Sequence, residues 1–402
     1  MNTIKSNKKA LFALAIGGFG IGLTEFVIMG ILTEVSVSLG VTIPQAGHFI
    51  AAYALGVVVG APLLTGLGSK LSPKKILFLL MIWFTVFNTL SGLAFGYKSL
   101  LILRFLSGIP HGAFFGIGAV VATKLAKKGK SAQGIAIMFS GLTVANVIGV
   151  PIGTYLGQQF SWSVSFYLVG FVGLLALASI YLWMPKIEIE ASEQKVSITK
   201  GLKNTELWAL IALTTIGTGG FFAWYSYVAP LITDVAGLPN HFVGYAMMLA
   251  GLGMVIGNFL GAKMADLFSP LKAVIISLSV MSAVLILNMF IATNSYLLMG
   301  MTFMIGVISF TVSTPIQMAI INTSKGSEML GSSMNQSAFN MGNASGAYLA
   351  GLPIAFGYGI IYSSLVGAIL AFAGVSIAVA ILIVRKRRAI KYKKMAISSL
   401  DT

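Results

Sequence analysis

Three ionisable side chains lie inside otherwise apolar stretches of the sequence. Glu25 is the only acid there, Arg104 is the only base, and His111 follows Arg104 by seven positions. A carboxylate at the centre of a bilayer costs about 2.5–3.5 kcal/mol even on insertion scales, so such groups usually face a cavity and serve a function. Because an apolar cavity favours the neutral acid, Glu25 is expected to take up and release a proton. Arg104 is expected to be its electrostatic partner, and His111 a further proton partner.

Each of these residues also has a purely structural interpretation. Glu25 could hold a permanent hydrogen bond to a neighbouring helix. Arg104 could extend to the outer headgroups, as long basic side chains do near the ends of spans. His111 could be a core histidine whose hydrogen bonds are satisfied.

Aromatic and amide side chains in the apolar stretches could form a surface for a solute. Buried amides seek hydrogen-bond partners, which a polar solute can supply, and the alternative is that they join one helix to another. The predicted substrate-binding residues are Tyr53, Asn146, Trp224, Tyr225, Tyr227, Gln317, Gln336, Asn340 and Asn343.

The sequence offers little for an enzyme or a metal site. It holds 3 histidines and no cysteine, which excludes disulfides and thiolate metal sites. It has no P-loop, no GxSxG motif and no Ser/His/Asp set. We therefore expect no catalytic residue, no cofactor, no bound metal and no enzymatic activity.

The elements that must position these residues are membrane-spanning helices. Charged residues make up 9% of the chain against about 25% in soluble domains, and the mean hydropathy is +0.93. A spanning helix needs about 20 apolar residues. Twelve spans are predicted, at 10–32, 46–67, 76–96, 99–123, 132–158, 162–184, 207–232, 241–262, 271–293, 295–321, 327–353 and 357–384.

The basic residues are distributed unevenly over this topology. Of the 26 Lys and Arg, all but Lys98 and Arg104 lie in the two tails or in links on one side. By the positive-inside rule, both termini and the central link are cytoplasmic. The net charge of +16 is therefore a topology signal rather than a nucleic-acid footprint. The run Arg385–Arg388 is expected to contact anionic lipid.

The chain also repeats itself at a spacing of 197 residues. Matched pairs are Gly56 and Gly253, Pro73 and Pro270, Gly129 and Gly326, and Asn146 and Asn343. We expect this spacing to hold through every span. Two similar multi-helix halves with the substrate site between them are a recurring design of secondary transporters.

The repeat predicts an all-α membrane protein built from two pseudo-symmetric six-helix bundles. The predicted parts are an N-terminal tail at 1–9, bundles at 10–184 and 207–384, a cytoplasmic central loop at 185–206, and a basic cytoplasmic tail at 385–402.

Several motifs resemble those of a known transporter family. Span 5 carries Gly149, Pro151 and Gly153 in an arrangement similar to the antiporter motif GPxxGG, with two substitutions. Arg104 begins a stretch in span 4 that is similar to the element RxxxGxxxG.

Two links are similar to the gating loop DRxGRR of the same family. The link after span 2 carries Ser69, Lys70 and Lys74, with Ser69 in place of the usual acid. The second copy keeps an acid, Asp266, followed by Lys272.

Together these features resemble the major facilitator superfamily, in its twelve-span drug:proton antiporter branch. Three stretches also resemble the arabinose-efflux-type permeases, namely Leu23–Gly30, Tyr53–Pro62 and Pro110–Gly116. The family's acid in span 1 falls on Glu25, and its span 4 arginine falls on Arg104.

The resemblance implies efflux of small organic solutes, such as sugars or drugs, from the bacterial cytoplasm by alternating access and driven by proton entry. An uncoupled facilitator or an importer is an alternative within transport, and a non-transporting membrane sensor or enzyme is an alternative of another class. We expect a multi-pass protein of the cytoplasmic membrane that works as a monomer. Its expected partners are a small solute, protons and membrane lipid, but no nucleic acid.

Overall fold

The structure is a computed structural model that describes residues 2–41, 43–68, 71–187, 203–239 and 241–398. This part of the chain is helical and contains no strand. The helices of the first half are α1 (Asn2–Gly30), α2 (Leu32–Leu39), α3 (Ile43–Leu67), α4 (Pro73–Ser91), α5 (Tyr97–Leu125), α6 (Ser131–Val144), the π-helix η2 (Ala145–Gly149), α7 (Val150–Gln159) and α8 (Trp162–Trp183). Those of the second half are α11 (Thr205–Tyr225), α12 (Val228–Pro230), the π-helix η3 (Leu231–Val235), α13 (His241–Leu267), α14 (Pro270–Ile291), α15 (Ser295–Thr323), α16 (Glu328–Ala355) and α17 (Tyr362–Ser398).

Within the described residues, 11 helical stretches are long and apolar enough to cross a membrane. The predicted span absent from that set is α16, whose 28 residues reach about 42 Å. Its composition explains the difference, because it buries polar side chains including Ser332, Asn335 and Gln336. These lie against neighbouring helices rather than lipid, as intramembrane polar groups usually do.

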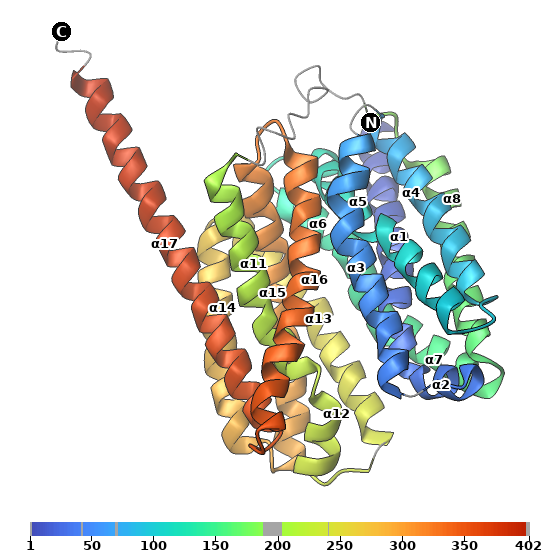
Figure 1. Ribbon diagram of the computed structural model, residues 1–402. Helices are drawn as coiled ribbons and strands as arrows, with labels where there is room; N and C mark the ends of the chain where they lie inside the picture. Colours follow the sequence, from blue (N-terminus) through green and yellow to red (C-terminus); the bar gives the residue numbers. More distant parts are fainter. Residues whose placement is uncertain (1, 42, 69–70, 188–202, 240, 399–402) are drawn as a thin grey trace.

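The helices form two side-by-side bundles, seen in blue to green and in yellow-green to red in Figure 1. The bundles meet where α16 packs on α3 and α5, and where α13 packs on α6. We call the end of the molecule at which α1 begins and α17 ends the terminal face, and the other end the opposite face. α17 is continuous from Tyr362 to Ser398, so it extends past the predicted end of the last span at 384.

The same local signals shape both halves. A Ser-Pro pair begins α4 and α14, with proline in the first turn, where its missing N–H costs no helix hydrogen bond. Gly129 and Gly326 have φ values of 78° and 80°, a conformation that favours glycine, in equivalent turns.

The expected spacing of 197 is wrong for one helix pair. A side chain added to Gly108 would collide with the backbone oxygen of Tyr53, and one added to Gly306 would collide with that of Ala250. Tyr53 and Ala250 are 197 residues apart, whereas Gly108 and Gly306 are 198 apart. α5 and α15 are therefore equivalent at a spacing of 198. Links tolerate such insertions, and the register has returned to 197 by Gly129 and its counterpart.

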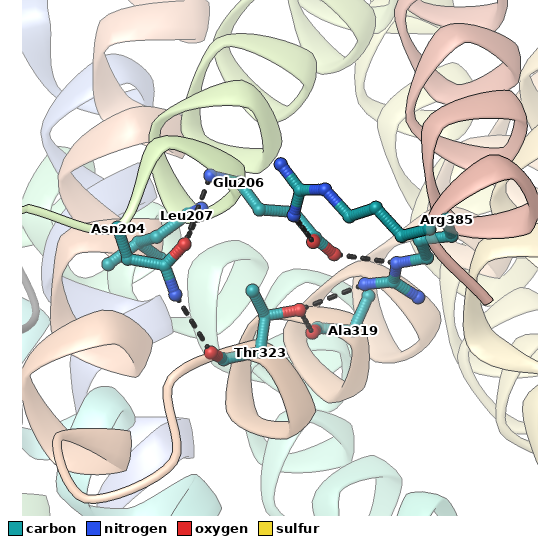
Figure 2. A network of polar contacts seen from close by, with 7 residues as sticks. Asn204, Glu206, Leu207, Ala319, Thr323 and Arg385 are labelled. Atoms are coloured by element: carbon teal, nitrogen blue, oxygen red, sulfur yellow. Dashed lines mark hydrogen bonds and ion pairs between the residues drawn. The ribbon is translucent and has the colours of Figure 1, made fainter. Parts of the chain in front are cut away.

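A polar network ties three helices together at the terminal face of the second half (Figure 2). Arg385 of α17 donates from Nε to Glu206 of α11 at 2.6 Å and from Nη2 to the hydroxyl of Thr323 at 2.9 Å. Asn204 caps α11 and donates to the backbone oxygen of Thr323 at 3.0 Å. Arg388 adds a longer contact of 3.6 Å to Glu206. The network joins α11, α15 and α17.

Candidate functional site

A small cavity lies between the two bundles, and we call it the polar cavity. It has a volume of about 60 Å³, against about 300–1,000 Å³ for sites that enclose drug-sized ligands. Its lining residues come from α1, α5, α6, α11, α15 and α16; they are Glu25, Phe26, His111, Phe139, Leu142, Phe222, Phe310, Ser313, Gln336, Phe339, Asn340 and Asn343. In this state the cavity has room for a few water molecules, so an organic solute requires its walls to move apart.

Glycines in α1 place Glu25 against this cavity. A side chain at Gly18 would meet the backbone oxygen of Met138, and one at Gly22 would meet the backbone of Leu142, both on α6. α1 and α6 therefore approach backbone to backbone, as helices with small residues at every fourth position can. Glu25 lies on this face and is partly exposed to the cavity. Within the described residues its carboxyl group has neither a hydrogen bond nor an ion pair.

Arg104 is completely buried, with 0% of its surface exposed. It donates from Nη1 to the hydroxyl of Thr24 at 3.0 Å and from Nη2 to the Thr24 backbone oxygen at 3.2 Å. Its guanidinium carbon lies 4.4 Å from the ring centre of Tyr53 and 5.5 Å from that of Phe166. Arg104 therefore does not extend to the surface. Thr24 and two aromatic faces hold it inside the first half.

Thr24 connects Arg104 to the segment of α1 that carries Glu25. It is the neighbour of Glu25 in the chain, it accepts from Arg104, and it donates to Asn88 of α4. No ion pair joins Glu25 to Arg104 in the part of the chain that the structure describes, and the Nε of Arg104 has no partner there. The two charges are thus neighbours without being neutralised by direct contact.

Tyr53 links Arg104 to His111. Its ring stacks on the guanidinium, and its hydroxyl lies 3.1 Å from Nδ1 of His111. His111 also packs on the ring of Phe115, with ring centres 5.3 Å apart. Glu25, Tyr53, Arg104 and His111 therefore form one cluster. The sequence predicts Tyr53 as a substrate-binding residue, whereas its contacts in the structure are to Arg104 and His111.

The predicted amides occupy two layers. Gln336, Asn340 and Asn343 of α16 line the polar cavity. Gln317 of α15 lies behind them, where its Oε1 accepts from Asn335 at 2.5 Å and from Gln336 at 3.3 Å, and its Nε2 donates to the hydroxyl of Ser332.

Sequence reasoning missed several members of these networks. Thr214 donates to Asn335 at 2.7 Å, and Thr24 and Ser332 anchor Arg104 and Gln317. A usable signal was that Ser332 and Asn335 lie within one turn of Gln336.

Asn146 lies outside the cavity, although it matches Asn343 in the repeat. Its Nδ2 donates to the backbone oxygen of Leu142 at 3.2 Å, and a side chain added to Gly251 of α13 would contact it. It belongs to η2, the π-helical segment directly before α7.

The antiporter-like motif packs α7 onto α1. A side chain at Gly149 would meet Phe19, and one at Gly153 would meet Val27. Pro151 lies in the first turn of α7. The three residues therefore make contacts inside the first half and do not line the cavity.

Trp224, Tyr225 and Tyr227 also lie away from the polar cavity. Trp224 is fully buried, and Tyr225 stacks on Phe221 with ring centres 5.0 Å apart. The hydroxyl of Tyr227 donates to the backbone oxygen of Ala347 at 3.3 Å. The aromatic residue of α11 that lines the cavity is Phe222.

The predicted gating residues are spread over different contacts. Ser69 and Lys70 lie outside the described residues. Lys74 donates to the backbone oxygens of Tyr181 and Met184 at 2.8 and 2.6 Å, and thereby caps α8 within its own half. Lys272 has an exposed side chain, and its backbone N–H donates to the Ser269 cap of α14.

Asp266 makes a contact between the halves. Its Oδ1 accepts from the backbone N–H of Ala132 at 3.4 Å. This places a carboxylate at the N-terminus of α6, where the helix dipole favours negative charge.

Other contacts close the terminal face on the same side of the cavity. The hydroxyls of Thr65 and Ser333 lie 2.6 Å apart, and Asn258 donates to the backbone oxygen of Ala136 at 2.7 Å. Thr65 lies two residues before the end of α3, and Ser333 lies in the second turn of α16. The halves are therefore joined between the polar cavity and the terminal face.

Comparisons with known proteins agree with this architecture. The model of the Major Facilitator Superfamily matches residues 14–332. AraJ of Escherichia coli (strain K12) is 40% identical over 92% of this chain and 94% of its own length. The inner membrane transport protein YdhP of Escherichia coli (strain K12) is 38% identical over 90% of this chain and 92% of its own length.

Among solved structures, the transporter FucP in the outward conformation has a similar fold. It aligns with a TM-score of 0.74 at 16% identity, covering 92% of this chain and 98% of its own. The predicted fold is thus confirmed, and the predicted family is confirmed by the match of its model and by both relatives. The chain belongs to the Major Facilitator Superfamily, and it is a multi-pass membrane transporter.

Proposed function

We propose that this transporter exports small organic solutes from the bacterial cytoplasm in exchange for protons. The observation that carries the proposal is the state of Glu25, whose carboxyl group has no partner within the described residues and faces the polar cavity. A carboxyl group that faces a cavity without a fixed partner can exchange its proton with whatever fluid or solute enters. A carboxylate in a permanent hydrogen bond could not do so as readily.

Arg104 supports the reverse step, the loss of the proton. Its buried charge lies beside Glu25 and has an unpaired Nε. A nearby cation stabilises the ionised carboxylate, so Glu25 can release its proton without becoming an isolated buried charge. The stacking on Tyr53 and the two bonds to Thr24 keep this cation in place through the cycle.

The proposed topology puts the terminal face in the cytoplasm, because almost all basic residues lie at that face or in its links. The contacts of Thr65 with Ser333 and of Asp266 with α6 then form the cytoplasmic gate. They are closed in this state, so the cycle requires them to separate when the cavity opens inward. Arg385 and Arg388 are engaged by Glu206, so we expect the exposed Lys386 and Arg387 between them to contact anionic lipid at the same face.

The driving force is sufficient for uphill export. One proton that enters down an inside-negative membrane potential of 100 mV gains about 2.3 kcal/mol, which corresponds to roughly fiftyfold accumulation of a neutral solute on the outer side. We expect one polypeptide to complete the cycle alone, since both halves of the cavity come from the same chain.

Uptake into inverted membrane vesicles tests this proposal. The panel holds radiolabelled sugars, purines and amphenicols, each measured with and without a protonophore. The proposal predicts that at least one solute accumulates and that the protonophore abolishes its accumulation. Accumulation that ignores the protonophore would contradict proton coupling and favour a facilitator.

A further inference from the structure

The two halves carry different chemistry at equivalent positions of the polar cavity. The positions equivalent to Glu25 and Tyr53, 197 residues on, are Phe222 and Ala250. Those equivalent to Arg104 and His111, 198 residues on, are Thr302 and Ser309. The charged cluster is therefore confined to the first half.

The amides show the opposite distribution. Gln336 is equivalent to Phe139, and Asn340 to Thr143. Packing supports this register, because Gly22 contacts Ala145 as Gly219 contacts Gly342. Recognition by neutral hydrogen bonds is thus concentrated in the second half, on one face of α16.

Two amides of this face have an oxygen that no hydrogen bond within the described residues engages. The Nε2 of Gln336 is used by Gln317, and the Nδ2 of Asn340 is used by the backbone oxygen of Gln336, at 3.3 and 3.1 Å. Within the described residues, the Oε1 of Gln336 and the Oδ1 of Asn340 have no partner. The Glu25 carboxyl group adds further acceptor oxygens. Gln336, Asn340 and ionised Glu25 therefore offer acceptor oxygens to a solute, beside the one remaining N–H of each amide.

The remaining wall is aromatic. Five phenylalanines line the cavity, namely Phe26, Phe139, Phe222, Phe310 and Phe339. Such rings bind flat apolar bodies by stacking and edge contacts, and they leave the ring hydroxyls of a sugar without partners. An unpaired polar group in the bound state is costly.

We infer that the polar cavity selects aromatic solutes that carry N–H donor groups, and that Gln317 is a positioning residue for this selection. This inference rests on the proposed function, because it assigns the substrate class of the same site. The aromatic body contacts the phenylalanines, and the N–H groups donate to Gln336 and Asn340. By engaging the amide nitrogen of Gln336, Gln317 keeps the oxygen of that amide directed at the solute.

Equilibrium binding to the purified full-length protein in detergent, measured by calorimetry, tests the inference. The probes are two matched pairs: indole with 1-methylindole, and benzylammonium with benzyltrimethylammonium. Each pair keeps the aromatic body and the charge but replaces N–H by N–CH₃. We expect the N–H member to bind about tenfold or more tightly, since methylation leaves buried acceptors unpaired.

Variants assign the selection to the amides. Gln317→Leu should reduce the preference for indole over 1-methylindole to within about threefold and leave the Kd of 1-methylindole unchanged. Gln317→Glu keeps an acceptor oxygen for Gln336 and should restore the preference. Asn340→Leu should weaken the preference for the N–H member of each pair without disturbing Gln317. It therefore provides a second variant if Gln317→Leu does not fold. The matched control is Thr143→Val, at the position equivalent to Asn340 but outside the cavity, and it should leave both Kd values unchanged.

Three results would overturn the assigned substrate class. They are equal affinity within both pairs, tighter binding of the methylated members, and no binding of any probe. Retained preference in Gln317→Leu would overturn the positioning role. Binding in detergent requires no proton gradient, so the inference can fail while proton-coupled flux is observed, and it can hold while flux proves uncoupled.

Discussion

Removing the hydroxyl of Thr24 should destabilise the charged cluster through Arg104. Thr24→Val keeps the shape of the side chain but deletes the acceptor for Nη1 of Arg104 and the donor to Asn88. The bond from Nη2 to the backbone oxygen of Thr24 remains. The substitution therefore leaves one charged N–H without a partner in a site with no access to water.

The magnitude follows from the kind of bond that is lost. Hydrogen bonds to charged groups contribute about 1.5–3 kcal/mol, and an unsatisfied buried partner adds to the cost. Arg104 is fully buried, so water cannot replace the lost acceptor. We expect the free energy of unfolding to fall by about 2–3 kcal/mol. Thr24→Ser should recover most of it, because serine restores the hydroxyl.

The assay is reversible unfolding in mixed micelles, combined with a double-mutant cycle. Thr143→Val is the matched control, since Thr143 is buried and bonds to the backbone oxygen of Ser140 at 3.1 Å within its own helix. In an Arg104→Met background the effect of Thr24→Val should shrink by about 1.5 kcal/mol or more, the smaller value of one charged hydrogen bond. A loss no larger than that of the control, or full additivity with Arg104→Met, would refute the role given to Thr24.

Three further predictions concern other contacts of the molecule. Tyr53→Phe keeps the ring over Arg104 but loses the contact to His111, so its Tm should fall less than that of Tyr53→Leu; equal shifts would exclude a contribution from the stacked ring. Asp266→Asn removes a charge worth about 0.3–1 kcal/mol at a helix N-terminus. Maleimide labelling of Thr65→Cys from the cytoplasmic side should therefore rise about two- to fivefold, and the absence of native cysteines makes this readout specific. Unchanged labelling would contradict the proposed cytoplasmic gate. Glu206→Gln should lower the free energy of unfolding by at most about 1 kcal/mol, and less at high salt, because the ion pair to α17 is partly exposed; a larger loss that salt does not affect would show that the network acts as a buried one.

The sequence was sufficient to identify the site residues that are of a type rarely found in membrane spans. Glu25 and Arg104 are conspicuous because charges in apolar spans are expensive, and the structure places them in one cluster with His111. Thr24 could not be found in the same way. Threonine is common in spans and usually bonds within its own helix, as Thr218 and Thr302 do here.

Aromatic and amide residues were harder to place, because composition does not reveal which helix face points inward. Asn146 and Asn343 are equivalent in the repeat, yet only Asn343 lines the cavity. Trp224 and Tyr225 are buried among residues of their own half, while the neighbouring Phe222 reaches the cavity. The one-residue slip of α15 was also invisible, since the matched glycines on either side keep the spacing of 197.

The central claim is that Glu25 carries the exchanged proton, and one comparison tests it most directly. Inverted vesicles that contain the wild-type protein or Glu25→Gln are compared, with a solute that the wild type accumulates. Net accumulation of this solute is measured in empty vesicles under a pH gradient. Exchange of the solute is measured in preloaded vesicles without a gradient. We predict that Glu25→Gln loses accumulation but retains exchange, because solute binding and alternating access persist without the proton step. Accumulation by Glu25→Gln at the wild-type level would contradict the account.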